Sequence, residues 1–405
     1  MVGLSGARKS LLIALFVAPM FLGVLVFNIY PILLNVYISF TNYNRFHPNP
    51  DCDLWLNSIM EPRCWPMFRP RLPQGLGTPF TLQQPIYQNY VDLFGRLFTR
   101  RALESLAQIA LCLTPLVFAF FLHRYWERRR GRLGNSGWVW GGAFLTSFAL
   151  AAGLDLPRAL VDLMESGDFI AVVFRTVLFV ATRVPLSFLL GLVLALILNH
   201  PSLPGRTFFR VVLFLPWAAS SVAILMALVW QFFFREQGTI NQLLALLGMK
   251  GPIWLNHPFS AFAIVVLVDV WFSYPFFMVV ILGALQSIPL ELYEAAEVDG
   301  ASWWDQLRHI TLPLIRPAVL PATVLTSITA FQMFGTAWAI TGGGPITGVG
   351  KPGATEFVMI YAYKQIYQLQ NYGRAAAFAV IIFGMLFLAT LYSLRLTRIT
   401  KGAYE

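Results

Sequence analysis

Regularly spaced carboxylates between two apolar stretches are the first feature of this sequence that could support a specific interaction. Three glutamates follow Pro289, a residue type that favours the first turn of a helix, at intervals of three: Glu291, Glu294 and Glu297. Residues three apart lie on the same face of a helix, so this spacing predicts one acidic face. Asp299-Gly300 then supplies a turn in which glycine can take a left-handed conformation. The segment is predicted to be a short acidic helix that ends in a turn.

The residues around this turn extend the prediction to a helix–turn–helix. A second short amphipathic helix is predicted from Ala301 toward Ile310, and the small Ala295 and Ala296 lie beside the acidic face. Insertion of an amphipathic helix into a groove is a common mode of protein association. We interpret the segment as a docking element for a soluble partner.

A single carboxylate, Asp269, interrupts an otherwise apolar stretch from Phe259 to Pro289. A charged group that faces lipid costs roughly 2.5–3.5 kcal/mol on insertion scales. Asp269 is therefore expected to face an internal path, or to form an ion pair with Arg183 or with a residue of another subunit.

Other residues that commonly do chemistry are scattered. The five histidines lie far apart, at positions 47, 123, 200, 257 and 309. The sequence has no D-D-x-x-D or H-E-x-x-H cluster, and three cysteines are too few for a zinc site or a disulfide scaffold. Gly350-Lys351 is followed by Pro352 and lacks the earlier glycine of a phosphate-binding loop, G-x-x-x-x-G-K-[ST]. The sequence predicts neither a metal site nor an enzymatic centre.

The composition indicates a bilayer as the main solvent. Of the 405 residues, 57% are hydrophobic and 12% are charged, whereas soluble domains carry about 25% charged residues. The mean hydropathy is +0.65. The net charge of +10 is spread over short loops between apolar runs, which is typical of membrane topology and not of a nucleic-acid-binding patch. We expect an integral membrane protein that binds no nucleic acid.

Apolar runs define the fold class, since about 20 apolar residues are needed to cross a bilayer. Eight candidate runs are Leu11–Asn44, Ser105–Leu122, Leu133–Leu154, Phe169–Asn199, Val211–Phe234, Phe259–Pro289, Pro317–Gly350 and Ala375–Leu394. The sequence predicts an all-α polytopic membrane protein with about eight transmembrane helices. The first run lacks an A-x-A-like cleavage site, so we expect it to be a retained helix.

Basic residues in the loops predict the orientation of these helices. The segment 124–132 contains five arginines and is expected in the cytoplasm, whereas the loop 154–168 has only Arg158 and is expected outside. Basic residues before the first helix and after the last predict cytoplasmic termini. The long loop 41–103 carries seven arginines on the side predicted to be external, an exception that long loops often make.

The segment from Asn44 to Thr99 is rich in proline, glycine and aromatic residues and has no sustained period, so we expect a small irregular external cap. It contains Cys52 and Cys64, separated by eleven residues. In an oxidising compartment these cysteines could form a disulfide that contributes about 2–3 kcal/mol of stability. Two free thiols are the alternative.

One segment matches a known pattern. Glu294-Ala-Ala-x-x-x-Gly300-x9-Ile310-x-Leu-Pro313 resembles the EAA loop of the membrane subunits of binding-protein-dependent ABC importers. Four further segments are similar to the carbohydrate branch of this family and to its MalF-type subunits: Ser39-Phe-Thr-Asn-Tyr43, Trp271-Phe-Ser-Tyr-Pro275, Thr341-Gly-Gly-Gly-Pro345 and Tyr372-Gly-Arg-Ala-Ala-Ala377. The resemblance covers the first helix and about 170–400.

The region 44–169 departs from the family pattern. For the EAA-like loop to lie in the cytoplasm, an insertion after the first helix must cross the membrane an even number of times, as the runs 105–122 and 133–154 do. We therefore divide the chain into a first transmembrane helix (1–40), an external loop with an inserted transmembrane hairpin (41–169), and a permease core (170–405) with its coupling loop at 288–315.

The resemblance implies a type I ABC importer permease, which forms half of an import path for a sugar or oligosaccharide of the maltose or trehalose kind. The implied partners are a second permease subunit, an ABC ATPase dimer and an extracytoplasmic solute-binding protein. ATP and Mg would bind the ATPase, and this chain would bind no cofactor and catalyse no reaction. The expected location is the cytoplasmic membrane of a bacterium or archaeon. The implied ATPase-coupling residues are Glu294, Ala295, Ala296, Gly300, Ile310, Leu312 and Pro313.

Candidate sugar contacts are also implied by position. They are Asp269, Phe272, Ser273 and Phe276 in one helix and Thr326, Ala330 and Met333 in the next. The maltose subunits carry amide groups at several of these positions where this chain has none, which leaves the identity of the sugar open. A carboxylate accepts hydrogen bonds from vicinal hydroxyls, so Asp269 favours a neutral polyol or sugar over an anionic substrate.

Two other classes of membrane protein would need residues that this sequence lacks. An ion-coupled secondary transporter, the alternative prediction, would need paired intramembrane carboxylates, and only Asp269 is available. A membrane-embedded transferase would need the acidic or histidine clusters that are missing. Both classes leave the EAA-like loop unexplained.

Overall fold

The computed structural model describes residues 6–47, 80–95, 99–130, 137–165, 168–348 and 351–401. Within these ranges the regular structure is helical, with two isolated β-bridges and no strand. The helices are α1 Gly6–Val24, α2 Tyr30–Ile38, α4 Gln88–Phe94, α5 Arg100–Arg130, α6 Gly137–Gly153, α7 Leu156–Glu165, α8 Asp168–Asn199, α9 Arg206–Ala218, α10 Ala223–Phe233, α11 Thr239–Leu246, α12 Pro258–Gln286, α13 Glu291–Val298, α14 Trp303–Gln306, α15 Leu312–Phe331, α16 Gly335–Thr341, α17 Val358–Tyr363 and α18 Tyr372–Lys401. The predicted all-α class is confirmed.

Seven helical spans in the described part of the chain are long and apolar enough to cross a membrane. They are Ala14–Ile38, Arg100–Trp126, Asp168–Asn199, Arg206–Phe233, Pro258–Gln286, Trp303–Phe331 and Tyr372–Leu391. A further apolar pair, Gly137–Gly153 with Leu156–Leu163, is bent by 68° and makes an eighth crossing if it acts as one span. The predicted number of about eight agrees with this count, although a bent pair takes the place of the predicted run 133–154.

The span before the C-terminal helix differs from its prediction. The run Pro317–Gly350 was expected to be transmembrane, but the helix occupies Trp303–Phe331. The chain then turns, and α16 packs against α10, where the Gln231 side-chain amide donates to the Ile340 carbonyl oxygen at 2.9 Å. The chain stays apolar between the end of α15 and the start of α16 because both helices pack in the same bundle. The apolar run therefore does not show where the transmembrane helix ends.

The second short helix, predicted from Ala301 toward Ile310, does not end there. α14, a π-helical turn at Leu307–Thr311 and α15 follow one another without interruption, which corrects that prediction. The Leu312 N–H donates to the Leu307 carbonyl oxygen, five residues back. This wider turn changes the hydrogen-bond ladder directly before Pro313, which has no N–H to contribute, and the helix continues past the proline.

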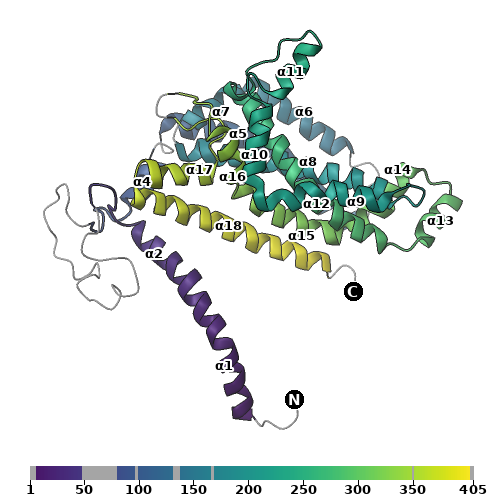
Figure 1. Cartoon of the computed structure of the whole chain (residues 1–405), viewed down its shortest axis with the longest axis horizontal. Coiled ribbons are helices and arrows are strands. Elements are labelled where there is room, and N and C mark those ends of the chain that lie inside the picture. The colour runs from purple at the N-terminus through teal and green to yellow at the C-terminus, as the bar shows by residue number, and fades with distance from the viewer. Residues whose placement is uncertain are drawn as a thin grey trace. The chain divides into compact units, whose positions relative to one another are not determined.

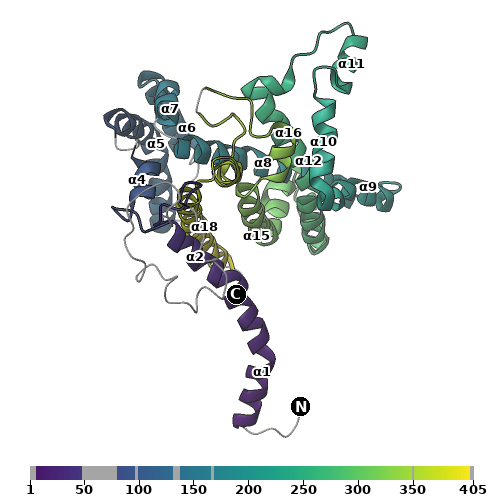
Figure 2. The ribbon, with the colours of Figure 1, turned by 60° about the vertical axis from the view of Figure 1, so that its left-hand side comes forward.

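The chain forms two compact units. One comprises Met1–Gly95 and Ala362–Met385, and the other comprises Arg96–Tyr361 and Leu386–Glu405. In the second unit α8, α12 and α15 contact one another pairwise (Figures 1 and 2), and α8 with α12 forms the most extensive helix pair. These three helices surround the site described below.

In the first unit, the segment after α2 is tied to α4 and to the start of α18. The Asn89 side-chain amide donates to the carbonyl oxygens of Ser39 and Thr41, both at 2.8 Å. Tyr43 stacks on Tyr372 with ring centroids 4.6 Å apart. Two of the segments noted for their family resemblance, 39–43 and 372–377, are therefore neighbours. The predicted cap contains helix α4 in its described part, and Cys52 and Cys64 lie outside the described residues.

A stripe of residues spaced four apart on α8 faces α12. Arg183, Ser187, Gly191 and Ala195 are successive members of this stripe, and all four are buried. A Cβ atom on Gly191 would lie 2.7 Å from the Phe277 Cβ and 2.9 Å from the Met278 nitrogen. Glycine is thus required for the close approach of the two helices, and the polar residues one and two turns earlier meet α12 at the same interface.

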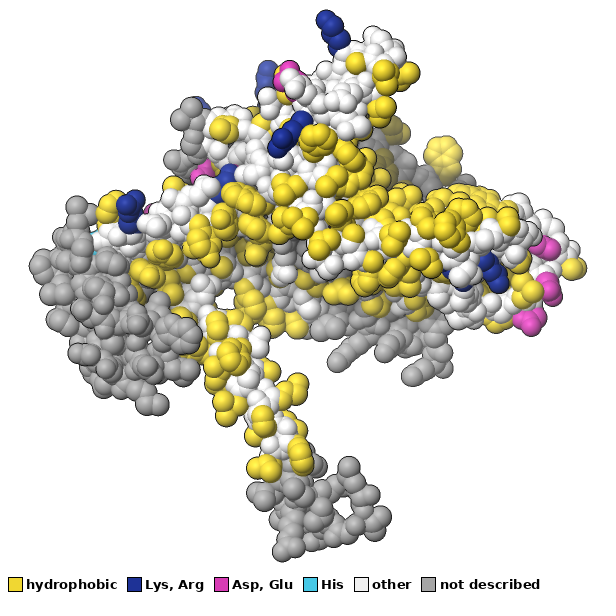
Figure 3. All heavy atoms as spheres, in the orientation of Figure 1, with side chains coloured by type: hydrophobic (Ala, Val, Ile, Leu, Met, Phe, Trp, Pro, Cys, Tyr) yellow, Lys and Arg dark blue, Asp and Glu magenta, His cyan; other side chains and the backbone are white. Residues whose placement is uncertain are grey.

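Apolar side chains are exposed on the outer faces of the helices in both units. Figure 3 shows hydrophobic side chains over much of the visible surface, while acidic side chains gather at the end that carries α13. Many large residues on α8, α9 and α10 are exposed, among them Leu189, Phe208 and Leu225. Apolar surfaces of this extent suit a hydrocarbon solvent.

The glycine-rich segment 341–345 turns the chain after α16. Gly342 and Gly343 have φ values of +60° and +88°, which favour glycine. The following loop is fixed by Arg175 of α8, whose Nη1 donates to the carbonyl oxygens of Pro352 and Gly353 at 2.9 and 2.6 Å.

Candidate functional site

A cavity of about 420 Å³ lies among the helices of the second unit, within the size range of roughly 300–1,000 Å³ typical of small-molecule sites. It is lined by Arg183, Trp217, Ser220, Ala223, Asp269, Phe272, Ser273, Phe276, Leu325, Thr326, Thr329, Met333 and Thr336. Hydroxyl groups and one ion pair are thus combined with aromatic and aliphatic side chains. This mixture suits a ligand that has several hydroxyl groups and apolar ring faces.

The structure brings together most of the residues predicted as substrate contacts. Asp269, Phe272, Ser273 and Phe276 line the cavity from α12 at the i, i+3, i+4, i+7 spacing of one helix face. Thr326 and Met333 line it from α15 and the turn after it. Ala330 is fully buried and is not among the lining residues.

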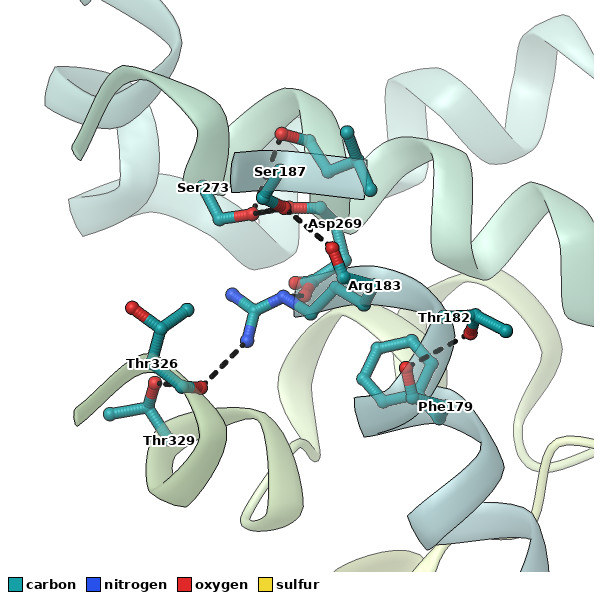
Figure 4. A network of polar contacts seen from close by, with 9 residues as sticks. Phe179, Thr182, Arg183, Ser187, Asp269, Ser273, Thr326 and Thr329 are labelled. Atoms are coloured by element: carbon teal, nitrogen blue, oxygen red, sulfur yellow. Dashed lines mark hydrogen bonds and ion pairs between the residues drawn. The ribbon is translucent and has the colours of Figure 1, made fainter. Parts of the chain in front are cut away.

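An ion pair between α8 and α12 forms part of the cavity wall (Figure 4). Arg183 Nε contacts Asp269 Oδ2, and the residues are 7% and 2% exposed. Arg183 Nη1 also donates to the Thr326 carbonyl oxygen of α15 at 3.3 Å. One guanidinium therefore connects all three helices around the cavity. Of the partners considered for Asp269, the structure has Arg183, and it places the pair at the cavity as well.

A pair of serines lies one helical turn beyond the ion pair. The hydroxyls of Ser187 and Ser273 are 2.6 Å apart. Each hydroxyl also lies within hydrogen-bond distance of a carbonyl oxygen in its own helix, Ser187 of Arg183 at 2.9 Å and Ser273 of Asp269 at 2.7 Å. The two hydroxyl protons can serve two of these three contacts at a time. Figure 4 shows the serine pair and the ion pair as neighbouring contacts between α8 and α12. The two serine hydroxyls thus have their partners within this interface.

Sequence reasoning missed several lining residues. Arg183 was considered only as a partner for Asp269, although a charge inside an apolar run was a signal that could have marked it. Trp217 and Ser220 border the cavity where a 3-10 turn at Ala219–Val222 separates α9 from α10. Pro216 marks that place in the sequence, although the apolar run 211–234 continues through it without a charge. Thr329 and Thr336 gave no signal beyond their polarity.

The predicted coupling residues occupy one connected segment between α12 and α15. Glu294, Ala295 and Gly300 are exposed, as are Leu312 and Pro313, while Ala296 and Ile310 are half-buried. The segment also exposes large apolar side chains, including Val298 at 89% and Trp303 at 63%. An acidic helix with adjacent apolar residues is the kind of surface that fits a groove on another protein.

Local hydrogen bonds explain the turn in this segment. The Ala301 N–H donates to the Ala296 carbonyl oxygen at 2.9 Å and the Gly300 N–H to that of Glu297 at 3.0 Å. This pair of bonds is the Schellman ending of a helix, and it places Gly300 at the left-handed position with φ +77°. Ser302 then caps the next helix in a reciprocal arrangement with Asp305.

The coupling segment is also fixed to the long helix that follows it. The hydroxyls of Tyr293 in α13 and Thr311 in the π-helical turn are 3.0 Å apart. This contact connects α13 to the helical span that carries Thr326 in the cavity wall.

In the described part of the chain, no group of three or more His, Cys, Asp or Glu side chains could hold a metal ion. Cys112, the free cysteine there, is buried in α5.

These features define a polytopic helical membrane protein with an internal polar cavity and an exposed acidic segment between two of its long helices. Residues 184–400 match the family described as binding-protein-dependent transport system inner membrane component. The chain belongs to this family, and its role is that of a membrane transport subunit.

Three curated relatives have names that state a transport role. The chain is 35% identical over 245 residues to the trehalose/maltose transport system permease protein MalF of Thermococcus litoralis, covering 60% of this chain and 80% of that protein. It is 36% identical over 261 residues to the sulfoquinovosyl glycerol transport system permease protein SmoG of Agrobacterium fabrum, covering 63% and 82%. It is 32% identical over 239 residues to the maltose/maltodextrin transport system permease protein MalF of Vibrio parahaemolyticus, covering 58% and 45%.

Proposed function

We propose that this chain is the membrane-spanning permease subunit of an ATP-driven ABC importer for a sugar or oligosaccharide. Family membership supports the transport role, and the names of the relatives support a sugar or a sugar derivative. The observation that carries the proposal is the cavity, because six of the seven predicted substrate contacts line it. The hydroxyl and charged groups of the cavity can bind sugar hydroxyls, and its aromatic rings can contact the apolar faces of a sugar ring.

In this proposal the sugar passes through the cavity between α8, α12 and α15. Asp269, Ser273 and Thr326 would hydrogen-bond sugar hydroxyls, and Phe272, Phe276 and Met333 would contact ring faces. Ala330 would act through packing behind the wall, since its side chain is buried. An ion-coupled mechanism has less support, because Asp269 is the single carboxylate among the described lining residues and is already paired with Arg183.

The acidic segment from α13 to the start of α15 would couple this passage to an ABC ATPase dimer. Glu294 and its neighbours would dock on the ATPase, and movement of α13 would reach the cavity through α15. ATP and Mg would bind to that partner. A second permease subunit would complete the path, and an extracytoplasmic solute-binding protein would deliver the sugar.

Reconstitution of the complete transporter tests the proposal. The chain would be co-expressed with its partner permease, ATPase and binding protein, and ATP-dependent uptake of labelled trehalose and maltose into proteoliposomes would be measured. We expect uptake that requires both ATP and the binding protein. Asp269→Ala should impair uptake while the complex and its ATPase activity persist; undiminished uptake would remove Asp269 from the path, and loss of the complex would assign it a structural role.

The coupling segment needs a separate test. Glu294→Lys should leave the subunit in the membrane but abolish transport and reduce recovery of the ATPase with the permease. Glu236→Lys, an equally exposed charge reversal in the loop between α10 and α11, is the matched control. Full transport by the Glu294 variant would refute the assignment of the coupling segment.

A further inference from the structure

The Arg183 guanidinium has hydrogen-bonding capacity that the protein does not use. An arginine carries five N–H donors in a rigid planar fork. Nε contacts Asp269, and Nη1 donates to the Thr326 carbonyl oxygen at 3.3 Å. No acceptor for Nη2 is found among the described residues, and Figure 4 draws one dashed line from the terminal nitrogens of this guanidinium, the contact with the Thr326 carbonyl oxygen. Because Arg183 lines the cavity, the unused donors are available to a ligand.

Asp269 has matching unused capacity as an acceptor. Oδ2 contacts Arg183, and the described residues provide no hydrogen-bond donor for Oδ1. A carboxylate oxygen of this kind can accept a hydrogen bond from a hydroxyl. The ion pair thus presents a donor and an acceptor side by side at the cavity wall.

The helix pair does not depend on this ion pair alone. Ser187 and Ser273 join α8 to α12 one turn away, and Gly191 allows close backbone packing a further turn along. Replacement of a buried ion pair by well-packed hydrophobic residues of similar volume is often neutral or even stabilising. The Arg183–Asp269 ion pair is therefore not needed to hold α8 against α12, and its position at the cavity wall indicates a second role.

We propose that Arg183 is a specificity-determining residue, and that Arg183 and Asp269 together bind two neighbouring hydroxyls of an uncharged sugar. One hydroxyl donates to Asp269 Oδ1 and the adjacent hydroxyl accepts from Arg183 Nη2. This inference rests on the proposed function, to which it adds a residue and a substrate class.

The net charge of the residues that line the cavity favours an uncharged ligand. Arg183 is the single Lys or Arg among the described lining residues, and Asp269 already neutralises it. An anionic sugar would have to approach Arg183 beside the Asp269 carboxylate, and like charges at such distances repel. A hydroxyl can donate to one group and accept from the other, so a vicinal diol matches both without disturbing the pair.

The deciding variant is the double substitution Arg183→Gln with Asp269→Asn. It removes both charges and leaves no buried ion unpaired, and Asn keeps the volume of Asp while Gln is shorter than Arg, so the complex should assemble. Uptake of trehalose or maltose, delivered at saturating concentration by the unchanged binding protein, should fall at least about tenfold, the effect expected from losing one hydrogen bond to a charged group. Recovery of the complex and stimulation of its ATPase by the loaded binding protein should stay within about twofold of wild type.

Thr182→Val is the matched control for this experiment. Thr182 precedes Arg183 on α8, does not line the cavity, and its hydroxyl bonds within its own helix. Uptake by this variant should equal that of wild type. Uptake by the double variant within about twofold of wild type would overturn the inference.

A second variant decides the matter if the double variant does not assemble. Arg183→Lys keeps the positive charge beside Asp269 but lacks the planar fork, so it should preserve the complex and lower uptake at least about tenfold. Undiminished uptake by this variant would overturn the inference. Uptake by the wild-type complex of sulfoquinovosyl glycerol and of neither neutral sugar would also overturn it, although the sugar-importer function would stand. Uptake of none of the three sugars would instead count against the proposed function.

Discussion

A graded series at Gly300 would measure how much the coupling segment depends on its turn. Gly300 has φ +77°, and a Cβ atom at this position would meet nothing within 4 Å. The cost of Gly300→Ala is therefore conformational alone, about 1–2 kcal/mol for a left-handed residue with a side chain. Asparagine tolerates this conformation better. Proline requires φ near −65° and removes the N–H that donates to Glu297, so it should cost at least about 3 kcal/mol.

These free energies predict the order of the variants in an assay of coupling. A cost of 1–2 kcal/mol lowers the population of the native turn relative to alternatives by roughly 5–30-fold. We expect recovery of the ATPase with the detergent-extracted permease, and sugar uptake, to fall in the order wild type, Asn, Ala, Pro. All variants should remain in the membrane, because the membrane-spanning residues are unchanged.

Gly248 offers a matched control on the same chain. It ends α11 in the same Schellman arrangement, with φ +72°, and a Cβ atom there also meets nothing within 4 Å. Gly248→Ala should carry the same local cost yet leave recovery of the ATPase unchanged. Two results would refute this prediction. In the first, Gly300→Ala recovers as much ATPase as wild type and Gly300→Pro recovers no less than Gly300→Ala. In the second, Gly248→Ala lowers recovery of the ATPase as much as Gly300→Ala does.

Three further predictions concern stability and topology. Gly191→Leu should destabilise the complex by about 1–3 kcal/mol or prevent its assembly, since α12 leaves no room for a side chain; thermal unfolding would check this against Gly283→Ala, a helix glycine whose Cβ would touch nothing. Asn89→Ala should lower the free energy of unfolding by about 1–3 kcal/mol because two buried carbonyl oxygens lose their donor, and an unchanged melting temperature would contradict this. In a cysteine-free background, a cysteine replacing Arg129 should be protected from an impermeant thiol reagent added outside and one replacing Gly75 should react; labelling at Arg129 would contradict the predicted topology.

The membrane-spanning helices were predictable because their signal is local. A run of about 20 apolar residues is needed wherever a helix crosses hydrocarbon, whatever its neighbours are. The same holds for the acidic segment, where Gly300 marked a turn that the structure explains by the Schellman hydrogen bonds. In both cases the physical requirement acts over a few residues, so the sequence carries it directly.

Helix ends inside the bundle were harder to predict. The break after Phe331 falls in an apolar run because α16 packs against α10, a contact between residues about 110 positions apart. The second short helix is predicted to run only from Ala301 toward Ile310, yet the π-helical turn at Leu307–Thr311 lets the helix continue past Pro313. Tertiary packing and a change of hydrogen-bond pattern decide these cases, and neither leaves a local mark.

In the candidate site, too, the sequence predicts which residues share a helix face but not how two helices pack against each other. The spacing of Asp269, Phe272, Ser273 and Phe276 placed them on one face, and that face lines the cavity. The sequence leaves two ion-pair partners open for Asp269, Arg183 or a residue of another subunit, because the apolar runs alone do not predict the register of α8 against α12. That register depends on Gly191, because α12 lies so close to this position that a Cβ atom there would be 2.9 Å from the Met278 nitrogen.

The close packing at Gly191 and the ion pair at Arg183 are therefore connected. Two charges in the interior of a membrane protein are tolerated when each has the other as a partner and when polar groups surround them. The glycine brings the helices together at one point, and the four-residue repeat along α8 then places Ser187 against Ser273 and Arg183 against Asp269. A side chain at position 191 would separate both pairs and leave a carboxylate and a guanidinium unpaired in an apolar bundle. The polarity of the cavity thus depends on the smallest residue of the stripe.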